Sequence, residues 1–148
     1  AGGKRVVTIA AKGENATANS VAFDTIRKEP GTKAVFIVIS DAHMAEVPED
    51  TEYTGWYWQA DFEYLNDPDI KQIVLYGCTA DDIKLRLLMA GIDPGIIEIV
   101  DDPSKIADAI DIEHVDGAYI AHCVTDVEIA HETADKLIDR IREVRDAR

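Results

Sequence analysis

Short apolar runs alternate along the chain with stretches whose apolar residues recur at helical spacing. The runs have the length and β-branched content of buried strands, and they lie at residues 5–11, 34–39, 71–76, 96–100 and 117–122. The first run suits a strand buried on both faces. Helical spacing is found at about residues 18–29, 80–90, 104–112 and 126–144. This alternation predicts an α/β fold: a three-layer, doubly wound, mainly parallel sheet with helices on both faces.

Two predicted helices begin with residues that favour helix starts. Thr79 is placed to cap the helix at residues 80–90. Asp81 and Asp82 lie in its first turn, where each carboxylate interacts favourably with the helix dipole and stabilises the helix by up to about 1 kcal/mol. Residues 101–104 begin the next helix in the same way. We therefore interpret these acids as structural.

The connection from Ser40 to about Asp61 is longer than the usual loop of about two to six residues. Six of the ten aromatic side chains crowd into residues 53–64, at and just beyond the end of this connection: Tyr53, Trp56, Tyr57, Trp58, Phe62 and Tyr64. Two interpretations are open. Either the rings form a docking surface with an embedded acid, because Trp and Tyr are enriched at interface centres, or they pin the connection onto the domain's own core.

The composition is that of one globular domain. At 148 residues the chain has single-domain length. We place the domain at residues 4–148 and interpret residues 1–3 as a tag remnant or linker. No apolar run approaches the roughly 18 residues of a membrane helix, and the first residues lack a secretory-signal pattern, so we expect a cytoplasmic protein without a membrane span. The net charge of −14 opposes binding to nucleic acid.

Polar residues follow every predicted strand, and the carboxyl ends of parallel strands share the edge where ligands bind. The candidates at this edge include Asn15, Asn19, Ser40, Asp41, His43, Thr79, Asp101, Asp102, His122 and Thr125. Asn15 and Asn19 have a second explanation, since asparagine also caps helices and shapes turns. Phosphate-binding signatures are missing from the sequence, so the pattern alone does not indicate a nucleotide.

The two cysteines, Cys78 and Cys123, can form at most one disulfide and do not have the spacing of a zinc site. We expect both to be buried thiols. A less favoured alternative is that Cys78 is a nucleophile with His122 or His43 as its base.

Residues 55–93, GWYWQADFEYLNDPDIKQIVLYGCTADDIKLRLLMAGID, resemble the C-terminal domain of MurT, the Mur-ligase-like subunit of lipid II isoglutaminyl synthase. That family has a tryptophan-x-tryptophan, acid-rich phrase similar to WYWQADFE, followed by a strand, a small-residue turn and a helix. Gln59 stands where the family often has an acid. The resemblance implies a Rossmann-like fold of the Mur ligase C-terminal domain type.

The resemblance also implies a function in peptidoglycan biosynthesis. In the whole enzyme, a central domain uses ATP with Mg²⁺ to activate a carboxylate of the stem peptide, and a glutaminase subunit of the GatD kind supplies ammonia. The C-terminal domain holds no cofactor and no metal, docks the glutaminase and supplies an aspartate to its cysteine and histidine. Asp61 is the first candidate and Asp41 the second. Residues expected to contact the partner or a ligand are Trp56, Trp58, Glu63, Asn15, Asn19, His43 and Thr79.

A second hypothesis is of another class. It is a stand-alone Rossmann-like domain that binds a small amino-acid-like or nucleotide ligand at the carboxyl edge of the strands, among Asn15, Asn19, Asp41, Thr79 and Thr125. Mur ligase C-terminal domains generally position an incoming amino acid, so the resemblance is compatible with this hypothesis as well.

Overall fold

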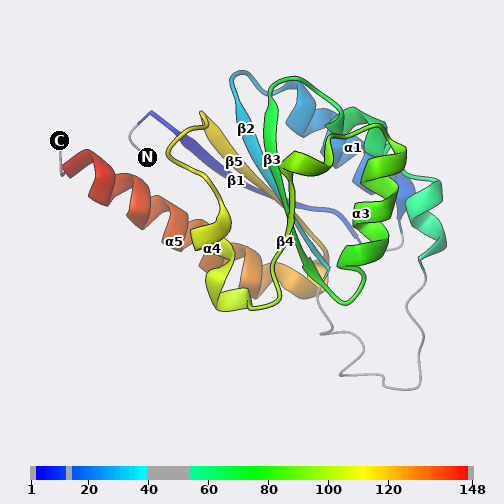
Figure 1. The fold of residues 1–148 in the computed structure, drawn as a ribbon. Helices are drawn as coiled ribbons and strands as arrows, with labels where there is room; N and C mark the ends of the chain where they lie inside the picture. The colour runs from blue at the N-terminus through cyan, green and yellow to red at the C-terminus, as the bar shows by residue number, and fades with distance from the viewer. Residues whose placement is uncertain (1–2, 13–14, 40–53, 147–148) are drawn as a thin grey trace.

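A computed structural model of the chain describes residues 3–12, 15–39 and 54–146 (Figure 1). The strands are β1 (Arg5–Ala10), β2 (Lys33–Ile39), β3 (Ile70–Gly77), β4 (Ile97–Ile99) and β5 (Gly117–His122). The α-helices are α1 (Ala16–Lys28), α3 (Ala80–Met89), α4 (Ile106–Ala109) and α5 (Val127–Asp146). Short 3₁₀ turns are η1 (Gly55–Trp58), η2 (Phe62–Leu65), η3 (Pro94–Ile96), η4 (Pro103–Lys105) and η5 (Val124–Asp126). No helix in these ranges combines the length and apolar character that crossing a membrane requires.

The five strands lie in one sheet in the order β1-β5-β2-β3-β4, and every neighbouring pair is parallel. The predicted α/β class with a parallel sheet is confirmed. β5 lies between β1 and β2, so His122 at its carboxyl end is in register with Ala10 and Val38. The expectation that the first strand is buried on both faces is wrong, because β1 is an edge strand and its end residues, Arg5 and Ala10, are exposed.

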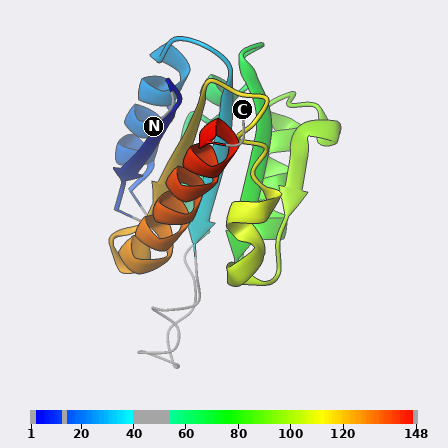
Figure 2. The same cartoon turned by 90° about the vertical axis from the view of Figure 1, so that its left-hand side faces the viewer.

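Alternate residues of the central strands face two separate cores. On β2, Val35 and Ile37 pack in the first core with residues of α1 and α3, whereas Phe36 and Val38 pack in the second core with residues of α4 and α5. Figures 1 and 2 show the corresponding layers on the two faces of the sheet. The turns η1 and η2 belong to the first layer, where η2 contacts both α1 and α3.

The helix predicted at residues 104–112 is shorter than expected, because η4 and α4 together end at Ala109. The side chain of Gln72 on β3 donates from Nε2 to the Ala109 carbonyl (2.8 Å) and accepts the N–H of Asp111 with Oε1 (2.9 Å). These bonds occupy backbone groups that a longer helix would pair internally. The chain then leaves the helix, and Ile112 packs in the second core.

Replacing Ile120 by alanine should lower the free energy of unfolding by about 2–5 kcal/mol, because the side chain is fully buried on the central strand β5 and the change leaves a cavity. Urea unfolding followed by circular dichroism measures this change. Val124→Ala, just beyond the same strand, is the control. Its side chain is exposed, so the expected change is within about 0.5 kcal/mol. Equal effects of the two variants would contradict the burial of Ile120.

Candidate functional site

The aromatic segment, residues 55–65, contains η1 and η2 and packs against α1 and α3. Three of its rings lie in the first core and are at most 2% exposed: Trp56, Tyr57 and Phe62. The ring centre of Phe62 lies 4.8 Å from that of Phe23 on α1 and 6.3 Å from that of Trp56. These three rings pin the long connection to the domain's own core, as one of the two interpretations states.

Trp58 is oriented differently from these three rings and is 57% exposed. Side chains of successive residues in a 3₁₀ turn point about 120° apart, so a turn that buries positions 56 and 57 directs position 58 outward. Of the two tryptophans predicted to contact a partner, Trp58 is the one that presents its ring to solvent. Partner contact by the buried Trp56 stays a prediction.

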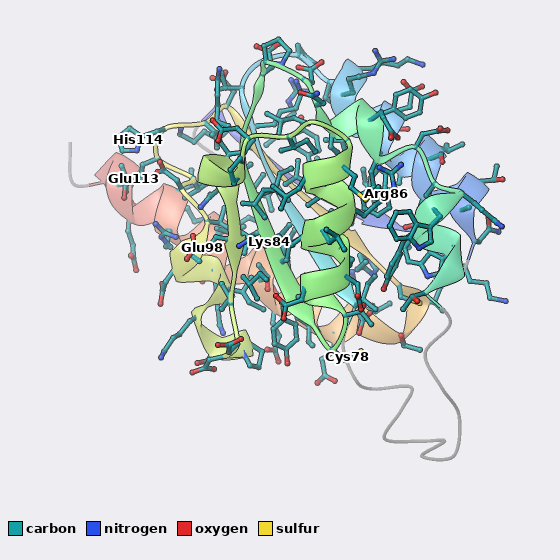
Figure 3. The ribbon with its side chains drawn as sticks, turned by 45° about the vertical axis from the view of Figure 1, so that its right-hand side comes forward. Cys78, Lys84, Arg86, Glu98, Glu113 and His114 are labelled. Atoms are coloured by element: carbon teal, nitrogen blue, oxygen red, sulfur yellow. The ribbon has the colours of Figure 1, made fainter. Side chains whose placement is uncertain are left out.

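Arg86 of α3 fixes the backbone of the aromatic segment. Its buried guanidinium donates from Nε to the carbonyl of Tyr57 (3.0 Å) and from Nη2 to the carbonyl of Ala60 (3.1 Å). Nη2 also donates to both carboxylate oxygens of Glu63, each 2.8 Å away, and this pairing offsets the cost of burying the charge. Figure 3 shows Arg86 on the side of α3 that faces this segment. Sequence reasoning missed Arg86, because the sequence of a helical stretch does not distinguish a buried arginine from a solvent-exposed one.

The side chain of Thr79 has a different role from the predicted one. Thr79 is the N-cap residue of α3, as the sequence predicts, but its side chain makes no capping bond. Its hydroxyl is instead hydrogen-bonded to the phenol of Tyr57. Because both residues are buried, this bond satisfies two polar groups inside the protein and connects the aromatic segment to the turn after β3.

The peptide group that joins Ala60 to Asp61 is held on both sides. Its carbonyl accepts the bond from Arg86 described above, and its N–H donates to Oγ of Ser20 on α1 (2.9 Å). The same hydroxyl donates to the Ala16 carbonyl (2.8 Å). The residues on either side of Asp61 are buried, whereas Asp61 itself is exposed. The Asp61 side chain therefore extends from a fixed backbone.

Asp61 lies at a surface hollow of about 490 Å³ between α1 and the aromatic segment. The hollow is lined by Thr17, Ser20, Val21, Asp24, Thr25, Lys28, Gln59, Asp61 and Tyr64. Hydrogen bonds from Lys28 and Arg27 hold the pKa of Asp24 below its ordinary value. The Asp61 carboxylate makes no capping bond and no salt bridge with the described residues. Asp61 is thus the lining acid that an outside donor can pair with.

Asn15 and Asn19 have structural roles at the start of α1. Asn15 caps the helix, its Oδ1 accepting from the N–H of Ala18 (2.9 Å). Asn19 donates from Nδ2 to the carbonyl of Lys12 (3.2 Å) and to that of Asn15 (2.9 Å). Ligand binding by either asparagine stays a prediction. Asp102 likewise caps η4, as the sequence predicts.

The structure describes some of the other candidates at the carboxyl edge. Asp41 and His43 lie outside the described residues. The expectation of two buried thiols is wrong, because Cys78 is exposed in the turn after β3 (Figure 3) and Cys123 is partly buried. Nδ1 of the buried His122 lies 2.8 Å from the Cys123 carbonyl, and it carries a proton there because a carbonyl can only accept.

Replacing Arg86 by methionine should destabilise the protein, because two buried carbonyls lose their donor at roughly 1–3 kcal/mol each. We expect the fluorescence of the buried Trp56 to shift to longer wavelength as the segment loosens. Denaturant unfolding and emission spectra measure the two effects. Lys84→Met, on the same helix, is the control that removes a charge without removing these bonds. Stability and emission equal to those of the control would refute the role of Arg86.

The ion pair between Arg86 and Glu63 depends on pH through the Glu63 carboxylate. Hydrogen bonding from Arg86 holds the pKa of Glu63 below its ordinary value of 4.5. A lowered folded-state pKa means that the pair contributes stability above the unfolded pKa and loses it as pH falls through the folded pKa. The difference in melting temperature between wild type and Glu63→Gln should therefore be largest near neutral pH and should shrink below about pH 4.5. A difference that persists at the same size in acid would contradict the pairing.

Comparison with known proteins bears on this arrangement. No curated protein matches the chain in sequence. Among models of protein families, the one described as MurT ligase C-terminal matches residues 13–127. The match covers well over half of the chain and includes the aromatic segment, Asp61 and Arg86. The chain therefore belongs to the MurT ligase C-terminal family.

Proposed function

We propose that this chain is the part of a MurT-like lipid II isoglutaminyl synthase that docks a glutaminase subunit of the GatD kind and supplies an aspartate to that subunit's cysteine and histidine. Membership of the MurT ligase C-terminal family supports the ligase assignment. One observation of the structure carries the rest: an exposed aspartate, Asp61, extends from a peptide group that two helices hold from both sides.

The chemistry of the role explains why a held peptide matters. An aspartate in a catalytic triad accepts the Nδ1–H of the histidine, which fixes the tautomer and stabilises the imidazolium that forms during the reaction. A carboxylate on a mobile loop would spend little time in position and would be screened by water. Asp61 has buried neighbours on both sides, so its freedom is limited to its own side-chain torsions.

Two other acids of the described residues, Glu63 and Asp24, fit the role less well. Both carboxylate oxygens of Glu63 are hydrogen-bonded to Arg86, so Glu63 serves the fold of the segment. Asp24, across the hollow, is engaged by Arg27 and Lys28. Asp41 remains the second candidate of the proposal.

The proposal assigns the remaining chemistry to other parts of the complex. The glutaminase hydrolyses the amide of glutamine and releases ammonia, which the ligase joins to a carboxylate of the peptidoglycan stem peptide, in the cytoplasm. ATP and Mg²⁺ activate that carboxylate at a site for which no residue of this chain is proposed. The chain is thus expected to act through its partner.

Asp61→Asn in the complete ligase-like subunit should lower glutamine hydrolysis by the assembled complex, by up to about 10⁴-fold, because an asparagine cannot stabilise the imidazolium. Release of glutamate measures the turnover. Binding of the glutaminase should persist, since the change is isosteric. Asp69→Asn, an exposed aspartate in the turn before β3, is the matched control.

Two results would contradict the assignment in different ways. Unchanged turnover with Asp61→Asn but lost turnover with Asp41→Asn would exchange the two candidates. Unchanged turnover with both variants would show that the chain supplies no aspartate.

A further inference from the structure

Exposed apolar side chains gather on the layer that contains α1, η1 and α3. Among the described residues, five of the seven exposed large apolar side chains belong to this layer: Val21, Trp58, Leu85, Leu88 and Met89. The other two, Val124 and Val127, lie where α5 begins. Positions 85, 88 and 89 are three and four residues apart and so share the outward side of α3. Other residues of the same helices fill the first core, so these five mark a surface for interaction.

The hollow beside Asp61 belongs to this same layer. Val21, which is 62% exposed, lines the hollow together with Asp61. Gln59, the neighbour of Trp58, lines it as well. Thr17 and Thr25 contribute hydroxyl groups. The hollow therefore combines an exposed apolar side chain, that of Val21, with a carboxylate that has no salt bridge to the described residues. Such a site fits a single N–H donor, either an imidazole or a cationic group.

The charge of the chain indicates what kind of partner covers this layer. Its 29 acidic and 15 basic residues give a net charge of −14. A second copy of the chain, or an anionic ligand, would be opposed by this charge, because like charges that face each other across an interface cost free energy. A protein with a basic contact surface would instead be attracted, and its association would be fastest at low salt.

We propose that the docking face, the outer side of the layer with Val21, Trp58, Leu85 and Met89 together with the Asp61 hollow, binds a protein surface that is apolar at its centre and basic at its rim. We propose that this partner inserts one N–H donor against Asp61. This inference rests on the proposed function, in which the partner is the glutaminase subunit and the donor is its histidine. Trp58 is the anchor of the face, since exposed tryptophans carry much of the affinity at interface centres.

A pair of matched variants tests the docking face. Val21→Glu places a charge on the face, and Val124→Glu places the same charge at a similarly exposed valine in η5, just before α5. In the complete ligase-like subunit, Val21→Glu should weaken binding of the glutaminase subunit at least about tenfold, as buried interface charges do. Val124→Glu should change binding less than twofold. Isothermal titration calorimetry measures both, and thermal melting checks that both variants fold.

A second substitution, on η1, tests whether weakened binding by Val21→Glu results only from a local change in α1. Trp58→Ala should also weaken binding at least about tenfold, the loss typical of an interface anchor. Raising the salt concentration should weaken binding of the wild-type subunit, since the partner surface is expected to be basic. Undiminished binding by both Val21→Glu and Trp58→Ala would overturn the docking face, and so would a larger loss with Val124→Glu.

The docking face and the aspartate supply can fail separately. Weakened binding by Val21→Glu together with normal turnover by Asp61→Asn would keep the face and refute the catalytic role. Normal binding by Val21→Glu and Trp58→Ala together with lost turnover by Asp61→Asn would keep the catalytic role and refute the face. No binding of the glutaminase by the wild-type subunit would refute both.

Discussion

A single peptide group, the one between Ala60 and Asp61, connects the two helices of the first layer. Arg86 on α3 binds its carbonyl, and Ser20 on α1 binds its N–H. The arrangement depends on a buried cation, which is unfavourable unless it is paired. Glu63 meets that requirement with both carboxylate oxygens. The position of the candidate aspartate is therefore set by charges and hydrogen bonds on either side of it.

The aromatic residues divide into two roles for a geometric reason. A 3₁₀ turn distributes three successive side chains around its axis, so η1 cannot bury all three of its large rings against one core. Trp56 and Tyr57 are directed inward, and Trp58 is left in solvent. The inward rings hold the segment in place, while the outward ring adds apolar surface beside the hollow. The inward rings therefore confirm that the segment is pinned to the domain's own core, while docking through the exposed Trp58 stays a prediction.

The first layer therefore has an inner side that folds the domain and an outer side that the fold does not require. Ile83 and Leu87 of α3 are buried, whereas Leu85 and Met89 of the same helix are exposed. The acidic charge of the chain fits this division, because it favours a basic partner over self-association. The proposed docking face and the backbone that positions Asp61 then belong to one layer of the protein.

The sequence by itself determined the five strands, their parallel arrangement and the long helices, because those features follow from local apolar periodicity and from the burial it demands. It also identified the phrase that contains Asp61. Only the tertiary structure decided that the first strand is an edge, that Gln72 ends the helix at Ala109, and that Arg86 holds the aromatic segment. Each of these depends on a hydrogen-bond partner or a strand neighbour far away along the chain. Local patterns cannot specify such partners, since the same residue in the same helix or strand can face either solvent or the interior.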